Sequence, residues 1–162
     1  MRYMMKEKIL SIGDDYTIQD ENGNDKYFVD GKVLTLSNKL SFQDLDGREL
    51  ALIKQRLISW KKTFDIYRDG NLVAVIKKNR FKFLHDRYVI DVPGPNDYDI
   101  TGNLLDHEYS FTRNGETVAR VSKKFFSFAD KYGIEIADNE DDVLILSAAV
   151  VIDLTAHEGR KN

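Results

Sequence analysis

Residues 143–154 of the chain, Val-Leu-Ile-Leu-Ser-Ala-Ala-Val-Val-Ile-Asp-Leu, form a nearly continuous apolar run. An α-helix of this sequence would be apolar around almost its whole circumference, so it would have to be surrounded on all sides. It would be about 18 Å long, which is too short for the ~30 Å hydrocarbon core of a bilayer. The sequence therefore predicts a helix at about 140–156 that is enclosed by the rest of the protein.

The residues that flank this run support a helix. Asp138-Asn139-Glu140-Asp141-Asp142 precedes it, and carboxylates at a helix N-terminus accept bonds from free N–H groups and interact favourably with the helix dipole. Gly159 follows as a stop signal. The alternative is one or two buried strands within 143–154, which the β-branched residues permit but the Ser147-Ala148-Ala149 centre disfavours.

Most of the remaining chain alternates between apolar and polar residues, as half-buried strands do. Asn-Gly or Asp-Gly pairs, which are typical of hairpin tips, occur at residues 22–23, 46–47, 69–70 and 114–115. Pro93-Gly94-Pro95-Asn96-Asp97 marks another connection. About twelve strands are expected, near residues 15–19, 25–29, 33–36, 40–44, 49–56, 61–68, 72–78, 82–91, 98–101, 107–113, 117–123 and 131–136.

An internal repeat strengthens this interpretation. Residues 68–78 and 113–123 align at an offset of 45 residues, with Arg, Gly, Val, Ala and the final Lys identical. Such a period also occurs in propeller blades, but two copies cannot close a propeller. We therefore expect a mainly β fold with one buried helix, namely a closed antiparallel barrel of about twelve strands around the C-terminal helix, which leaves no open sheet edge.

The composition limits the class of protein. The 162 residues are 42% hydrophobic and 31% charged, as expected for a single domain spanning residues 1–162. A net charge of −3 gives no overall attraction to nucleic acid, so no nucleic-acid partner is expected. The absence of cysteine excludes disulfides, thiolate metal ligands and thiol nucleophiles. Without a signal peptide or a transmembrane span in the sequence, we expect a cytoplasmic protein, and peripheral membrane association stays open.

Motifs of enzymes and of metal sites are missing. The sequence contains no phosphate-binding loop, no dinucleotide-binding glycine motif, no serine-hydrolase elbow and no His-Glu-x-x-His. His85, His107 and His157 have no metal-ligand spacing, and acidic stretches at 20–25 and 44–47 are explained by hairpin turns better than by calcium loops. We expect no catalytic residue, metal or cofactor, although a carboxylate pair that the fold assembles would escape this search.

Basic residues gather at Lys61-Lys62, at 77–82 and at Lys123-Lys124. If these strand ends share one rim of the barrel, they could hold an anionic lipid headgroup or a phosphate-bearing ligand. Outward-facing lysines that merely solvate the strands are the alternative. A protein-interaction or scaffold role is the main rival function, ahead of a hydrolase. The candidate anion-binding residues are Lys77, Lys78, Arg80, Lys123 and Lys124.

Several stretches, taken in their order along the chain, resemble a known family. Together with the terminal apolar run they resemble the LURP-one-related proteins, including bacterial members. This resemblance implies a twelve-stranded barrel around a central C-terminal helix, as in the C-terminal domain of tubby proteins and in phospholipid scramblases. Phe125 and Phe128 stand where tryptophans are expected. The matching stretches are 16–23, 27–31, the two repeated hairpins, 106–109 and 123–136.

The resemblance also suggests a class of function. Tubby domains bind phosphoinositides through surface Lys and Arg, scramblases act at membranes, and plant LURP-one relatives are linked to defence. A binding module, and not an enzyme, is therefore expected. Scramblase-like anchoring is disfavoured, because the cysteines that carry lipid in those proteins are missing and the apolar helix is too short to span a bilayer.

Overall fold

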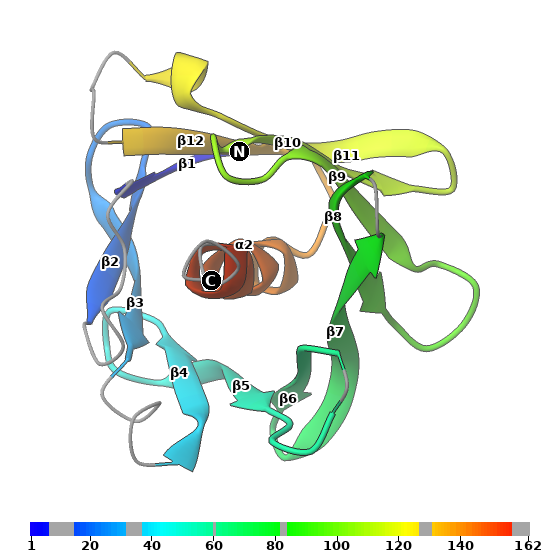
Figure 1. Ribbon diagram of the computed structural model, residues 1–162. Coiled ribbons are helices and arrows are strands. Elements are labelled where there is room, and N and C mark those ends of the chain that lie inside the picture. The colour runs from blue at the N-terminus through cyan, green and yellow to red at the C-terminus, as the bar shows by residue number, and fades with distance from the viewer. Residues whose placement is uncertain (7–14, 32–36, 60, 82–83, 127–130, 157–162) are drawn as a thin grey trace.

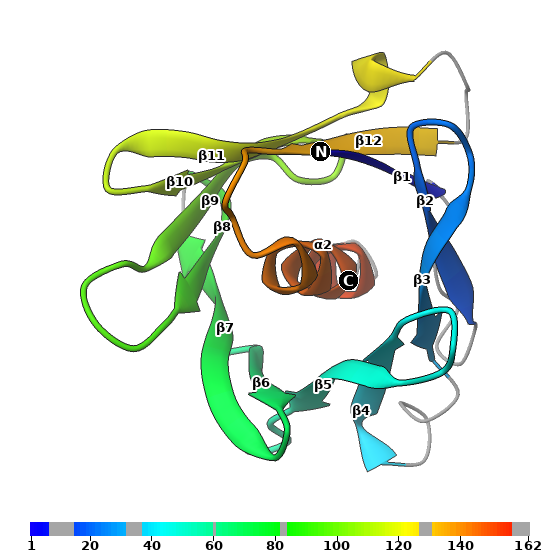
Figure 2. The ribbon, with the colours of Figure 1, turned by 180° about the vertical axis from the view of Figure 1, so that it is seen from behind.

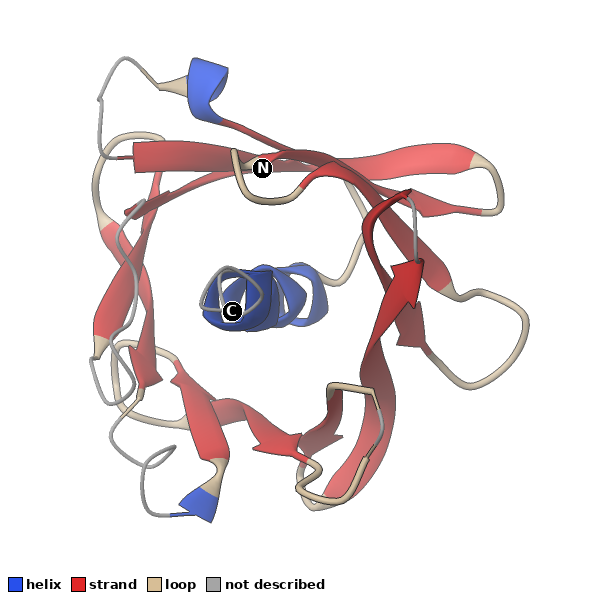
Figure 3. Cartoon of the chain, in the orientation of Figure 1, coloured by secondary structure: helices blue, strands red, loops and turns tan. Residues whose placement is uncertain are grey.

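The computed structural model describes residues 1–6, 15–31, 37–59, 61–81, 84–126 and 131–156. In this part of the chain twelve strands close into one antiparallel barrel, with helix α2 inside the ring (Figures 1 and 2). Strands that are consecutive in sequence are neighbours in the wall, and β1 pairs with β12 to close it (Figure 1). The strands surround the C-terminal helix (Figure 3). The predicted closed antiparallel barrel of about twelve strands around a C-terminal helix is confirmed.

The strands are short, apart from the eleven residues of β7. Their bounds are β1 Arg2–Lys6, β2 Tyr16–Asp20, β3 Asp25–Asp30, β4 Lys39–Gln43, β5 Glu49–Gln55, β6 Thr63–Arg68, β7 Asn71–Phe81, β8 Leu84–Asp91, β9 Tyr98–Asn103, β10 Glu108–Arg113, β11 Glu116–Ser122 and β12 Lys131–Ile136. A 3-10 turn, η1, spans Lys123–Phe125, and α2 spans Asp142–Ala156.

Helix α2 occupies the core of the molecule. Twelve of its fifteen residues are buried, which excludes the alternative of buried strands in this segment. The carboxylate of Asp141 accepts a hydrogen bond from the backbone N–H of Leu144 at 3.1 Å and so caps the helix. The predicted helix and its acidic cap are confirmed.

Along the strands of the wall, alternate side chains point into the same core. On β12, Tyr132, Ile134 and Ile136 are buried, whereas Glu135 between them is half-buried. This alternation follows from the two-residue period of a strand, which places successive side chains on opposite faces. The apolar surface of α2 and the inner face of the barrel thus form a single hydrophobic cluster.

The N-terminal strand was not predicted. β1 has three buried residues in succession, Tyr3, Met4 and Met5, so its sequence lacks the alternation that reveals a half-buried strand. Its pairing with β12 places Arg2 opposite Glu135 and closes the barrel. The strand expected at 33–36 lies outside the described residues.

The predicted hairpin tips are confirmed, with two kinds of turn. At Asp69-Gly70 and Asn114-Gly115 both residues have positive φ, from 47° to 80°, as a type I′ turn requires. At residues 22–23 and 46–47 only the glycine has positive φ. Residues 93–97 connect the directly paired strands β8 and β9.

The two ends of the barrel are chemically different. We call the end at which α2 begins the N-rim; it carries the hairpin tips at 22–23, 46–47, 69–70 and 114–115. We call the end at which α2 finishes the C-rim; its described part includes residues 56–59 and 61–62 of the β5–β6 loop and the turn at 104–107. In an antiparallel barrel successive connections alternate between these two ends.

Candidate functional site

The five predicted anion-binding residues lie at the C-rim in two separate groups. Lys77, Lys78 and Arg80 belong to β7, whereas Lys123 and Lys124 belong to η1, directly after β11. β7 and β11 are four positions apart in the wall, which is about 19 Å at the usual spacing of strands. The side chain of Arg80 is not among those that the structure describes. The anion-binding role of the five residues stays a prediction, and the wall separates the β7 residues from those of η1.

Lys78 points into the barrel. Along β7 it continues the inward series of Ala74 and Ile76, and it is only 5% exposed. Its Nζ donates a hydrogen bond to the carbonyl oxygen of Thr155 at 3.0 Å and lies 5.7 Å from the centre of the Tyr88 ring. An ammonium group is favourable at the negative end of a helix dipole. Lys78 therefore fastens the end of α2.

Lys77 points outward instead. Its Nζ contacts Asp91 on β8 at 2.7 Å, and both side chains are roughly half exposed. In η1, Lys124 is exposed, whereas Phe125 and the following Phe126 pack on β12: a Cβ added to Gly133 would come within 2.9 Å of the Phe126 ring and of the Phe125 Cβ. These aromatic side chains lie on the outside of the wall and cover Gly133.

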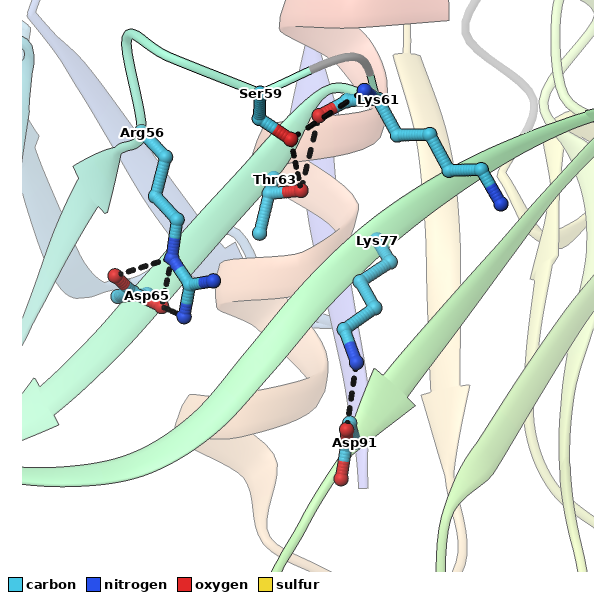
Figure 4. A network of polar contacts seen from close by, with 7 residues as sticks. All are labelled: Arg56, Ser59, Lys61, Thr63, Asp65, Lys77 and Asp91. Atoms are coloured by element: carbon cyan, nitrogen blue, oxygen red, sulfur yellow. Dashed lines mark hydrogen bonds and ion pairs between the residues drawn. The ribbon is translucent and has the colours of Figure 1, made fainter.

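A second basic segment adjoins the end of β7. The backbone N–H of Lys78 donates to the carbonyl of Lys62 at 2.9 Å, and Lys61 Nζ reaches the side-chain amide of Asn79 at 3.3 Å. The β5–β6 loop and β7 thus meet at the C-rim (Figure 4). Lys61 and Lys62 were visible as a cluster in the sequence, but only the strand pairing shows that they adjoin β7.

The cations of this region differ in how they are held (Figure 4). Arg56 contacts both carboxylate oxygens of Asp65, with distances of 2.6 to 3.0 Å. This fork raises the pKa of the Arg56 guanidinium further above its usual value. Lys61 has a neutral amide as its side-chain partner, and no carboxylate among the described residues. The positive charge of Lys61 is therefore less compensated than that of Arg56.

The acidic segment 138–142 is engaged at the N-rim. Arg68 forms a two-bond contact with Asp141 at 2.7 and 2.8 Å, and Arg113 contacts Glu140 at 2.5 Å. Tyr3 donates to Asp142, and its burial together with this bond raises the pKa of the phenol. The two arginines are equivalent positions of the internal repeat. These carboxylates hold the start of α2, in addition to capping it.

A buried polar cluster lies near the other end of α2. His107 Nε2 is 3.1 Å from the Asp153 carboxylate, which also accepts a bond from the Tyr132 hydroxyl, and the His107 and Tyr132 rings stack at 4.2 Å. His107 and Asp153 are both at least 93% buried. The pair therefore has no access for a substrate, and it secures the 104–107 turn to the helix.

Two open grooves flank the N-terminus at the N-rim. The larger, about 590 Å³, is bordered by β1, β11 and β12 and includes Arg2, Arg120 and Asp138. The smaller, about 360 Å³, follows residues 137–143 and shares Met1, Ala137 and Asp138 with it. Arg2 is paired with Glu135 at 2.5 Å, so the charges along the larger groove are largely balanced.

The described residues form neither a metal-binding cluster nor a membrane-spanning helix. No group of three or more His, Asp or Glu side chains there could hold a metal ion. In the same part of the chain no helix has the length and apolar character needed to cross a membrane.

The model of the LURP-one-related family matches residues 1–153. The chain belongs to the LURP-one-related family. It is 30% identical over 153 residues to the uncharacterized protein YxjI of Bacillus subtilis (strain 168), covering 94% of this chain and 92% of YxjI. An X-ray structure of a protein from Arabidopsis thaliana has the same fold, with a TM-score of 0.72 at 18% identity over 96% of this chain and 91% of that one.

Proposed function

We propose that this LURP-one-related barrel is a non-enzymatic binding module that recognises an anionic group at the C-rim, carried by a lipid headgroup or by a phosphate-bearing molecule. The meeting of two basic segments supports the proposal. Residues 54–62 and 77–82 each contain four basic and no acidic residues, in a chain whose net charge is −3. Concentrating positive charge at one end creates a local potential that attracts anions.

The strand pairing brings these segments together. Thr63 on β6 lies opposite Lys77 on β7, and the Lys62 carbonyl bonds to the Lys78 amide. Carboxylates compensate Arg56 and Lys77, but the Lys61 side chain contacts only an amide within the described structure. An anion at this rim could therefore contact Lys61 without displacing a carboxylate of the described structure, with Lys62 adjacent in the chain.

A protein-interaction role is the second candidate. The N-rim grooves favour it, because they are open and carry both signs of charge, including Arg120, Glu21 and Asp138. Such a surface suits a polar protein segment better than a phosphate group. Binding there should depend little on salt, since opposite charges on the groove offset each other.

Cosedimentation with phosphatidylcholine vesicles that contain phosphatidylserine tests the anion-binding proposal. We expect binding at low salt that weakens as the Debye length shortens from ~10 Å at 0.1 M to ~3 Å at 1 M. The double variant Lys61→Glu/Lys62→Glu should bind about tenfold or more weakly, since each basic residue near an anionic surface contributes about 1 kcal/mol.

The matched control is Lys26→Glu/Arg48→Glu, which makes the same change in net charge with residues near the N-rim hairpin tips. It should bind like the wild type. Competition with glycerophosphoserine and with inorganic phosphate separates recognition of a headgroup from recognition of phosphate alone. An anion site at the C-rim would be rejected if both double variants lost the same amount of vesicle affinity. It would also be rejected if the wild type bound neither vesicles nor either soluble competitor.

A further inference from the structure

The β5–β6 loop exposes two neighbouring aliphatic side chains. Leu57 is 72% exposed and Ile58 is fully exposed, more than any other large hydrophobic residue that the structure describes. The loop is closed beneath them by hydrogen bonds from Arg56 N to Thr63 O and from Thr63 Oγ1 to Lys61 O, both 2.9 Å. The exposed pair thus lies on a loop whose base is closed by hydrogen bonds.

The setting of these side chains distinguishes them from other exposed aliphatic residues. Leu45 and Leu72 stand singly near two different hairpin tips of the N-rim, as is ordinary on protein surfaces. Leu57 and Ile58 are adjacent and lie inside the basic segment 54–62. An aliphatic tip framed by basic residues combines the two attractions that hold a protein at an anionic bilayer surface.

The size of the tip favours a bilayer over a protein partner. A stable protein interface takes roughly 800 Å² from each partner, with a buried apolar centre. Two aliphatic side chains on a narrow loop cannot supply such a centre. They are sufficient to enter the boundary between headgroups and acyl chains, where the long side chain of Lys61 can extend back to the phosphates.

We infer that Leu57 and Ile58 insert into the interface of an anionic lipid bilayer while Lys61 and Lys62 contact its headgroups. This inference rests on the proposed anion-binding function and assigns the anion to a membrane surface. The barrel then sits with its C-rim on the membrane and with α2 pointing its C-terminal end towards the lipid.

The single tryptophan of the chain, residue 60, provides the reporter, because it is two residues from Ile58 in the sequence. Vesicles of phosphatidylcholine and phosphatidylserine are prepared with bromine on the upper part of the acyl chains. Bromine quenches tryptophan fluorescence only at short range, so wild type should be quenched on binding. Leu57→Ser/Ile58→Ser should bind about tenfold or more weakly and should lose the quenching.

Leu45→Ser/Leu72→Ser is the matched control, since it removes the same kind of side chain at the N-rim. It should behave like the wild type. Insertion is overturned if the wild type binds vesicles without quenching, or if the Leu57→Ser/Ile58→Ser variant binds as the wild type does. In either case the proposed anion-binding function stands, provided that Lys61→Glu/Lys62→Glu binds weakly. Binding of glycerophosphoserine without binding of vesicles would also overturn insertion while the anion-binding function stands. The Leu57–Ile58 tip would then be assigned to a protein partner.

Discussion

Two successive lysines of β7 have opposite roles. Lys78 is enclosed and bonds to the last turn of α2, whereas Lys77 forms an ion pair on the outside of the wall. A buried charge that bonds to the end of a helix contributes to stability very differently from a half-exposed ion pair. The surroundings, and not the residue type, thus separate a structural lysine from one that a ligand could contact.

Lys78→Met tests this distinction, because methionine keeps much of the aliphatic volume and removes the ammonium group. The Thr155 carbonyl would lose its charged donor, and the free energy of unfolding should fall by about 2 kcal/mol. Lys77→Met should change it by less than about 1 kcal/mol. Urea unfolding of both variants gives the comparison, and similar losses would argue against an anchoring role for Lys78.

Tyr109 offers a test in which removal of a polar group does no harm. Its hydroxyl is buried and has no partner among the described residues, so Tyr109→Phe should leave stability at neutral pH unchanged or raise it by about 1 kcal/mol. Tyr132→Phe is the control, since it takes a donor from the buried Asp153 and should cost about 2 kcal/mol. A clear loss in Tyr109→Phe would show that its hydroxyl has a partner.

The same residue should affect stability in alkali. Burial, with a further contribution from the nearby Asp153 carboxylate, raises the pKa of Tyr109 well above its usual value. The unfolded chain loses this proton near pH 10 while the folded protein keeps it, so stability declines as the pH rises above about 10. Tyr109→Phe should make that decline shallower in urea titrations between neutral pH and pH of about 11. If the stability of Tyr109→Phe depended on pH as that of the wild type does, a raised pKa of Tyr109 would be contradicted.

At the scale of elements, the internal repeat supplies two equivalent hairpins with one shared task. In the hairpins β6–β7 and β10–β11, the first strand ends with an arginine that reaches the segment before α2. Arg68 contacts Asp141 and Arg113 contacts Glu140. The two contacts differ in burial, because the Glu140 side chain is 6% exposed and that of Asp141 is 38% exposed. Equivalent positions in sequence therefore have unequal energetic weight.

Arg113→Met should accordingly destabilise the protein by about 2 kcal/mol, since it leaves a buried carboxylate without its charged partner. Arg68→Met should cost less than about 1 kcal/mol, because Asp141 can be solvated. Thermal or urea unfolding of both variants gives the comparison, and each variant serves as the control for the other. Equal effects, or a larger effect at Arg68, would mean that burial of the acid does not govern the contact.

Much of the fold was predictable at this scale. The apolar run at 143–154 revealed α2, and the Asn-Gly and Asp-Gly pairs revealed four hairpins, because both depend on local chemistry. β1 was missed since its buried Tyr3-Met4-Met5 has no period of two, and its place in the wall depends on pairing with β12, the last strand of the chain. That the barrel closes was predictable from the enclosed helix, but the pairing that closes it joins the two ends of the described chain, which local patterns do not reveal.

The site was less predictable, for a related reason. The two-residue period already indicates that Lys77 and Lys78 face opposite sides of β7, but the carbonyl of Thr155 that Lys78 meets is 77 residues away. Likewise, no local pattern shows that Lys61 lies beside Asn79. The exposure of Leu57 and Ile58 was invisible to a hydrophobicity pattern, which assigns such residues to the core.

For the whole molecule, charge is distributed along the axis of α2. Acidic residues adjoin the first turn, where the dipole is positive, and Lys78 adjoins the last turn, where it is negative. The basic segments 54–62 and 77–82 extend this positive charge at the C-rim. The barrel therefore has a direction, and we expect an anionic surface to orient it with the C-rim foremost.

Amide hydrogen exchange with and without phosphatidylserine-containing vesicles tests this orientation most directly. Peptides covering residues 56–62 should exchange more slowly when vesicles are present, those covering the hairpin tips at 46–47, 69–70 and 114–115 should be unchanged, and residues 146–152 of α2 should exchange slowly in both states because they are enclosed. Protection of the N-rim tips in place of 56–62, or fast exchange within α2, would contradict the account.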